Sequence, residues 1–425
     1  MRPRYYVCVV VGLWLAFVSV TTCPVEGAEF DTARGRQFDP ARQFPLLDRN
    51  DDNRLTKEEF QQLAARGGAN GGRREVFDRI FAQLDTDDSG ELSLEEFAGL
   101  SRLRGRTEPP IPAPVTSKAG LPNLYKLADG PHEVESVADL VLRDEKRGKD
   151  LQLRVSFPKD ADVFPVIVWS HGATGSKDDY QPLVRHWVSY GYVCIQANHS
   201  DSRALAGMSQ TGQVANKFHD WANRPKDVAF ILDSLDGIEA KVPGLKAKLD
   251  EKTIGVGGHS FGAHTAQLVA GTATVNLGGV RTSHADPRPK AFVLISPQGK
   301  GPQLDDKSWE GLTRPFLSIT GSNDWGRKGD PVDWRLDPFR LASSTDKYLL
   351  YIEGAHHDFG GIGGGVAYRN AGPANPNHLA YVKSTTTAFW DTYLKQDEKA
   401  QDFLRSNRMA AVSGGEAKLT FRSDR

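Results

Sequence analysis

Past residue 130, short runs of apolar residues alternate with segments in which apolar residues recur at helical spacing. Continuous apolar runs of strand length, separated by helices, are typical of a mostly parallel sheet that is buried on both faces. Two alternating segments around a charged loop at 144–148 predict an antiparallel hairpin ahead of that sheet. The pattern therefore predicts an α/β fold, with strands at 165–169, 192–197, 253–257, 291–296, 316–320 and 348–352 and helices at 181–190, 225–235, 263–270 and 378–394.

A repeated acidic pattern precedes this region. Two stretches, 48–59 and 85–96, place oxygen-bearing side chains at positions 1, 3, 5, 9 and 12 of a loop, and each ends on a glutamate. Carboxylate and carbonyl oxygens that converge from alternate positions suit a hard cation such as Ca2+. We therefore predict a small all-α EF-hand domain whose Ca2+ ligands are Asp48, Asn50, Asp52, Arg54, Thr56, Glu59, Asp85, Asp87, Ser89, Glu91, Ser93 and Glu96.

The surroundings of the two loops agree with this prediction. Leu55 and Leu92 occupy the position at which paired EF-hand loops form a short β-bridge, and the apolar spacing at 76–81 predicts a flanking helix. The first loop carries Asn53 where the sharp turn favours glycine, but asparagine tolerates the left-handed conformation better than most residues. The alternative is a pair of acidic surface loops in a module that has lost its metal.

The N-terminal segment has the order of a secretory signal peptide. Arg2 and Arg4 precede an apolar run at 5–20, and small and polar residues follow up to Ala28. We expect an exported protein, periplasmic or extracellular, with an uncleaved anchor or a lipoprotein modification at Cys23 as alternatives. The predicted organisation is a signal peptide at 1–28, an EF-hand pair at 40–105, a proline-rich linker at 106–128 and a catalytic domain at 129–425.

Charge and cysteine content narrow the class of protein. The formal net charge is −1 and no basic stripe is present, so nucleic-acid binding has no support in the sequence. No membrane signal is expected beyond the leader, and no pattern defines an oligomeric state. Two of the three cysteines lie in the leader, so Cys194 alone would remain after cleavage and could form no internal disulfide.

A serine lies at the turn between a predicted strand and a predicted helix. The run 258–262 reads Gly-His-Ser-Phe-Gly, a G-x-S-x-G motif that follows the strand at 253–257 and opens a helical segment. Strand, sharp turn and helix are the context in which this motif exposes a nucleophilic serine, and the glycines let two chain segments approach closely. We therefore predict that Ser260 is the nucleophile of an α/β-hydrolase fold, a mostly parallel sheet flanked by helices.

A serine nucleophile needs a histidine base that is oriented by a carboxylate, and in this fold the chain order is serine, acid, histidine. Asp324 follows the apolar strand at 316–320, and the pair His356 and His357 follows the strand at 348–352. We predict Asp324 as the acid and His357 as the base, with His356 as the alternative base. Other carboxylates near these strand ends are Asp330, Asp333 and Asp358, of which Asp358 is expected to be solvated.

Acyl transfer also requires hydrogen-bond donors for the oxyanion that develops on the substrate carbonyl. The backbone N–H of Phe261, directly after the nucleophile, is one expected donor. The strand at 165–169 continues into Ser170-His171-Gly172-Ala173, a sequence typical of the oxyanion loop in these hydrolases. The backbone N–H of Ala173 is then the second expected donor.

Residues from about 130 to 400 resemble an α/β-hydrolase of the dienelactone-hydrolase-like group. The resemblance rests on Ser170-His171-Gly172, the serine motif, Asp324, the run 354–357 and the run 224–228, which reads Arg-Pro-Lys-Asp-Val. Within that group the chain is most similar to platelet-activating-factor acetylhydrolases, chlorophyllases and bacterial polyester hydrolases. In acetylhydrolase-like members the acid comes one strand earlier, but here that strand ends without a carboxylate.

The resemblance implies a serine carboxylic-ester hydrolase that forms an acyl-enzyme on a small-molecule, lipid or polymer ester. Ca2+ bound to the EF-hand loops would take no part in the chemistry. Peptidases, thioesterases and acyltransferases use the same triad on the same fold and are alternatives. A further alternative is a non-catalytic, calcium-dependent exported binding protein.

Overall fold

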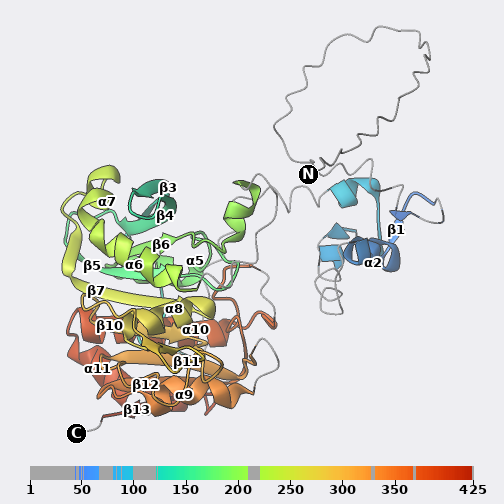
Figure 1. Cartoon of the computed structure of the whole chain (residues 1–425). Helices are drawn as coiled ribbons and strands as arrows, with labels where there is room; N and C mark the ends of the chain where they lie inside the picture. Colours follow the sequence, from blue (N-terminus) through green and yellow to red (C-terminus); the bar gives the residue numbers. More distant parts are fainter. Residues whose placement is uncertain are drawn as a thin grey trace, which may run out of the picture. The chain divides into compact units, whose positions relative to one another are not determined.

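The computed structural model describes residues 44–98, with gaps at 45–46, 49, 51, 67–79, 83 and 88, and residues 121–423, with gaps at 122, 209–220, 327–330 and 367–369. The chain divides into two compact units, Met1–Gly105 and Arg106–Arg425, which are shown in Figure 1. The predicted signal peptide and the predicted linker up to residue 120 lie outside the described residues. Within the described ranges, no helix is both long enough and apolar enough to cross a bilayer.

A nine-stranded sheet organises the described part of the second unit, in the order β13-β12-β11-β10-β7-β5-β6-β4-β3. The six central strands run parallel, whereas β4, β3 and the edge strand β13 pair antiparallel with their neighbours. The strands are β3 (Val134–Asp144), β4 (Lys149–Pro158), β5 (Phe164–Ser170), β6 (Val193–Ala197), β7 (Leu249–His259), β10 (Ala291–Ile295), β11 (Phe316–Asn323), β12 (Lys347–His356) and β13 (Ala417–Arg422).

Helices cover both faces of this sheet (Figure 1). Alternate residues of each central strand enter opposite cores: Ile167 and Trp169 of β5 pack with α5, α10 and α11, whereas Val166 and Val168 pack with α6, α7 and α8. Both faces of the strands are therefore buried, which explains their continuous apolar sequence. The helices are α5 (Gln181–Ser189), α6 (Asn223–Asp233), α7 (Leu235–Lys241), α8 (Phe261–Ala270), α9 (Asp337–Leu341), α10 (Pro376–Leu394), α11 (Glu398–Arg405) and α12 (Arg408–Val412).

The predicted α/β fold is confirmed, since each predicted strand and helix of this unit has a counterpart in the structure. The hairpin is also present, as β3 paired with β4. The C-terminal edge strand β13 and the short helices α7, α9, α11 and α12 were not predicted. Residues 417–422 are mostly partly exposed, so the strand has no apolar run to mark it.

The first unit contains the two acidic loops. Strands β1 (Leu55–Thr56) and β2 (Glu91–Leu92) pair antiparallel with Leu55 opposite Leu92, which confirms the predicted bridge. Helix α2 (Lys57–Arg66) follows the first loop, and Phe60 packs edge-on against Phe97 in a small aromatic core. The predicted helix at 76–81 lies mostly outside the described residues.

Candidate active site

Ser260 occupies a strained turn between β7 and α8. Its backbone has φ 56° and ψ −115°, a conformation that a non-glycine residue rarely adopts. A Cβ atom on Gly262 would lie 1.9 Å from the carbonyl oxygen of Ser170, and one on Gly258 would lie 2.3 Å from the carbonyl carbon of Gly262. The glycines on either side of Ser260 thus allow β5 and α8 to pass closely, as the motif predicted.

Asp324 and His357 meet beside this turn. Asp324 follows β11 and His357 follows β12, and the Nδ1 atom of His357 lies 2.7 Å from Oδ1 of Asp324. A carboxylate only accepts hydrogen bonds, so Nδ1 carries the proton and Nε2 of the neutral ring is left as the basic nitrogen. The structure therefore brings the predicted acid and the predicted base into hydrogen-bond contact, which is one of the contacts that a triad requires.

The carboxylate of Asp324 is wholly buried, receives two further donors and forms one ion pair. The hydroxyl of Ser296 lies 2.8 and 2.7 Å from its two oxygens, and the Thr320 hydroxyl lies 3.0 Å away. Nε of Arg335 lies 3.1 Å from Oδ2 in an ion pair and donates its proton to the backbone carbonyl of Asp324 at 2.6 Å. Arg335 also donates to the carbonyl of Ser296 at 2.9 Å. These donors hold the carboxylate in place without depending on His357.

Sequence reasoning missed Ser296 as part of this cluster. Ser296 directly follows β10, the strand end at which acetylhydrolase-like members carry their acid, and its hydroxyl also lies 3.0 Å from Nδ1 of His357. Ser296 ends the strand before that of Asp324, and parallel strands bring their carboxyl ends to one edge of the sheet. This position was the signal that could have placed Ser296 near Asp324.

The alternative residues lie elsewhere. The ring of His356 faces Asn323 and Asn370 rather than Asp324. Asp333 is exposed and forms a two-pronged ion pair with Arg340, with both distances 2.7 Å. Asp330 lies outside the described residues.

The expectation that Asp358 is solvated was wrong. Its side chain is buried and accepts a hydrogen bond from the backbone N–H of Gly363 at 2.8 Å. Burial raises the pKa of Asp358 to about 7, with the nearby charge of Asp179 adding to the effect. The loop after His357 folds back over this carboxyl group, which a local reading of the sequence cannot anticipate.

His259, the residue before Ser260, connects the segment of His357 with the loop after β5, which it reaches through Tyr180. Its Nε2 lies 2.8 Å from the carbonyl oxygen of His357, and the two rings are 4.5 Å apart. Its Nδ1 lies 3.0 Å from the hydroxyl of Tyr180, which accepts from the N–H of Gly172 at 3.0 Å. Burial lowers the pKa of His259 well below its ordinary value, so the ring is neutral: Nε2–H donates to His357 and Nδ1 accepts from Tyr180.

The two predicted oxyanion donors lie on segments adjoining Ser260. Phe261 is the first residue of α8 and directly follows Ser260, so its N–H lies at the N-terminus of the helix. Ala173 lies in the loop after β5 and is half-buried, and the described residues offer its N–H no acceptor. Phe261 and Ala173 adjoin the chain segments that the glycines bring together, and their role as oxyanion donors stays a prediction.

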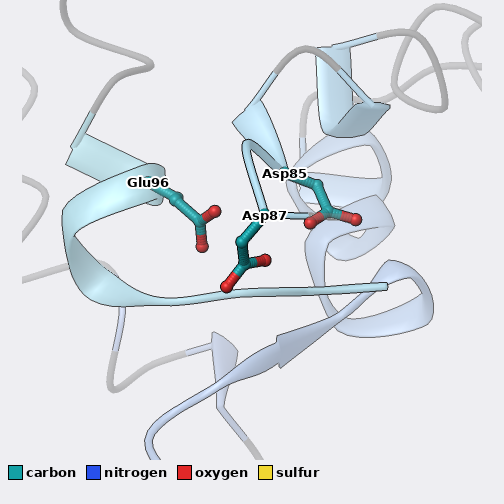
Figure 2. Close-up of side chains that lie close together, drawn as sticks. All are labelled: Asp85, Asp87 and Glu96. Atoms are coloured by element: carbon teal, nitrogen blue, oxygen red, sulfur yellow. The ribbon is translucent and has the colours of Figure 1, made fainter. Parts of the chain in front are cut away.

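The second acidic loop gathers its carboxylates around one space (Figure 2). Ligand atoms of Asp85, Asp87 and Glu96 all lie within 4.8 Å of one another. Hydrogen bonds to Glu96, led by the backbone N–H of Ser93 and joined by Thr86, lower the pKa of this carboxyl group to about 2. Gly90 adopts φ 80° at the sharp turn, and the hydroxyl of Ser89 donates to the carbonyl of Glu91 at 2.9 Å. This donor set, in which every ligand atom is an oxygen, fits Ca2+.

The first loop folds in the same way. Asp48 accepts from the N–H of Asn53 at 2.9 Å, and Asn53 adopts φ 60°, the left-handed conformation for which its tolerance was noted. Asn50 donates to Asp52 at 2.6 Å, and the N–H of Arg54 donates to Asp52 at 2.8 Å. At the end of the loop Glu59 accepts from both the N–H and the hydroxyl of Thr56, at 2.9 and 2.8 Å.

Comparison with protein families agrees with both units. Residues 41–102 match the family model for an EF-hand domain pair, and residues 128–298 match that for chlorophyllase. The matched part of the second unit is similar to the α/β-hydrolases of the dienelactone-hydrolase-like group, in agreement with the mostly parallel sheet. More particularly, the chain contains a chlorophyllase-family domain behind an EF-hand pair. No curated protein matches the chain. The chlorophyllase match includes Ser260 but ends before Asp324 and His357, so these two rest on geometry.

Proposed function

We propose that this chain is a serine carboxylic-ester hydrolase that works through Ser260, His357 and Asp324. The single observation that carries the proposal is the 2.7 Å contact between His357 and Asp324 beside a serine held at φ 56°. The chlorophyllase-family match supports hydrolase chemistry, and the strained turn supports a nucleophilic role for this serine. The substrate class that we propose is a small-molecule, lipid or polymer ester.

The reaction would proceed in two steps. Nε2 of His357 takes the proton from the Ser260 hydroxyl as its oxygen attacks the ester carbonyl, and the buried carboxylate of Asp324 stabilises the imidazolium that forms. The N–H groups of Phe261 and Ala173 bind the oxyanion of the tetrahedral intermediate. The imidazolium then protonates the leaving alcohol, and water releases the acyl group in a second attack that His357 again assists.

Ca2+ would bind to the EF-hand loops and stabilise that unit. The Asp85, Asp87 and Glu96 cluster supports this role, since its oxygens converge within 4.8 Å. Acyl transfer by a serine, histidine and aspartate needs no metal ion, so we propose that Ca2+ does not take part in catalysis. We further propose export, on the evidence of the leader at 1–28.

Rival functions of the same fold differ in the acyl acceptor or the bond cleaved. A peptidase or thioesterase would prefer an amide or a thioester, and an acyltransferase would pass the acyl group to an added alcohol. Initial rates on matched ester, thioester and anilide substrates with one acyl group separate these outcomes.

The test compares wild-type full-length protein with Ser260→Ala on 4-nitrophenyl esters of increasing acyl length. Removal of the nucleophile should lower kcat by about 10⁴-fold or more. Ser136→Ala, at an exposed serine of β3, is the matched control and should retain wild-type rates. Ester turnover that persists within tenfold in Ser260→Ala, or is absent from the wild type, would overturn the proposal.

A further inference from the structure

Two residues of α6 lack a role in the proposed triad although they carry part of the family resemblance. Arg224 and Asp227 stand three residues apart in the first turns of the helix, so they share one face. Both are buried, with 1% and 0% of the residue surface exposed. A buried charge is costly unless it is fully paired, so the partners of these side chains indicate what they do.

The guanidinium of Arg224 anchors the loop that carries Ala173. It forms a two-pronged ion pair with Asp201, at 2.9 and 2.8 Å, and donates to the carbonyl oxygens of His171 at 2.7 Å and Gly172 at 3.3 Å. Asp201 in turn accepts from the N–H of Thr174 at 3.1 Å. The Arg224 and Asp201 pair therefore holds the chain on both sides of Ala173.

The carbonyl of Gly172 decides where the Ala173 N–H points. These two groups belong to one planar trans peptide, in which C=O and N–H point in opposite directions. Gly172 O is fixed by Arg224 and also by Nδ1 of His171 at 2.6 Å. Nε2 of His171 accepts from the N–H of His199, so Nδ1 carries the proton and donates. With its carbonyl held on the Arg224 side, the peptide presents the Ala173 N–H on the other.

The guanidinium of Arg224 also contacts Phe261, whose backbone N–H is the other proposed oxyanion donor. Its central carbon lies 4.4 Å from the centre of the Phe261 ring, within the range of a cation–π contact. One cation thus touches both chain segments that hold proposed oxyanion donors.

Asp227 braces the start of the same loop. It accepts from Nδ1 of His199 at 2.9 Å, and Nε2 of His199 lies 2.6 Å from the hydroxyl of Ser170. Lys149 and Arg147 complete the pairing of Asp227, each at 2.7 Å. This serine, histidine and aspartate are arranged like a triad, but the serine and histidine are each only 1% exposed and no substrate can reach them.

We propose that Arg224 is a positioning residue that fixes the two oxyanion donors of the ester-hydrolase site, Ala173 and Phe261, relative to each other. The inference rests on the proposed function. It also gives the Arg-Pro-x-Asp sequence a role: the arginine sets the direction of the donors and the aspartate fixes the strand end from which their loop departs.

The test measures kcat, KM and the affinity for an arylboronic acid, which becomes tetrahedral on a nucleophilic serine. Arg224→Met should lower kcat about 100-fold with KM changed less than about threefold, because oxyanion donors act on the transition state and small misplacements are costly. The boronic-acid affinity should fall in parallel. Arg224→Lys keeps the charge but loses the two-pronged geometry and should fall between Arg224→Met and the wild type.

Arg314 offers a matched control. It donates to the carbonyls of Asp286 and Pro289 and lies 4.7 Å from the ring of Phe292, none of which belongs to the candidate site. It also donates to the carbonyls of Val269 and Ala270, which lie at the C-terminal end of α8, whereas Ser260 precedes its N-terminal end. Arg314→Lys should therefore keep kcat within about twofold.

The outcomes separate the two proposals. A wild type without Ser260-dependent turnover would overturn the proposed function. An active wild type with folded Arg224 variants whose kcat stays within threefold, or whose loss lies in KM alone, would overturn the role of Arg224 only. Should Arg224→Met not fold, Arg224→Lys and Asp201→Asn test the role of Arg224 by the same criteria. Each of these substitutions weakens the ion pair between Arg224 and Asp201 while keeping a side chain of similar size.

Discussion

Replacing Asp324 by asparagine tests how the proposed triad is held together. The carboxylate accepts from His357, Ser296 and Thr320, forms an ion pair with Arg335, and is wholly buried. An amide of the same shape offers one acceptor oxygen and two N–H donors. Its oxygen is drawn to Arg335 and the two hydroxyls, so the amide nitrogen is left to face His357.

The consequence falls on the tautomer of His357. A ring nitrogen facing an N–H group must accept, so the ring proton moves to Nε2, the atom that has to take a proton from Ser260. In serine hydrolases, replacing the aspartate that orients the histidine by asparagine lowers kcat about 10⁴-fold, equivalent to an increase of about 5 kcal/mol in the activation free energy. KM should change little, since the carboxylate does not touch substrate.

The assay is kcat on a 4-nitrophenyl ester, with circular dichroism to show that the variants fold. Asp358→Asn is the matched control: it is also a buried aspartate of the same region, yet its carboxyl group accepts from Gly363 and not from His357. Its turnover should stay near the wild-type value. A rate for Asp324→Asn within tenfold of wild type would refute the assignment of the acid.

Three further predictions follow from the same contacts. Burial raises the pKa of Asp358 to about 7, so between about pH 4 and 7 the folded protein binds a proton that the unfolded chain does not. The free energy of unfolding should therefore fall by at most about 4 kcal/mol as pH rises through that range, and level off above it. Asp358→Asn should remove this pH dependence and raise Tm at pH 8. His357→Ala should lose at least about 10³-fold in kcat whereas His356→Ala should lose less than threefold, and the reverse pattern would transfer the base to His356. Calorimetric titration of chelator-treated protein should show Ca2+ binding that Glu96→Gln weakens at least tenfold, and absence of heat at millimolar Ca2+ would reject both loops.

Local pattern was enough to predict the parallel strands and the residues at their ends. Each central strand is apolar because both of its faces are buried, and parallel strands bring their carboxyl ends to one edge of the sheet. Ser260, Asp324 and His357 could therefore be placed near one another from their order alone. The EF-hand loops were predictable for a similar reason, since their ligands come from consecutive positions of one short segment.

Contacts between distant segments were not predictable in this way. Ser296 reaches Asp324 across 28 positions, and Arg224 reaches the carbonyl of Gly172 across 52. Asp358 is buried beneath the loop that contains Gly363, whose N–H donates to its carboxyl group. Most residues of the edge strand β13 are at least partly exposed, so the strand contains no apolar run. These features depend on how the loops pack once the sheet has formed. The sequence marks at most the position of a residue, such as Ser296 at its strand end, and not the partner that the residue contacts.

Intact-mass and peptide mapping after treatment with a fluorophosphonate tests the central claim most directly, because this reagent phosphonylates only an activated serine. The account predicts one adduct per wild-type chain, located on the peptide that contains Ser260, and no adduct in Ser260→Ala. An unmodified wild type, or an adduct of the same stoichiometry on another serine in Ser260→Ala, would contradict it.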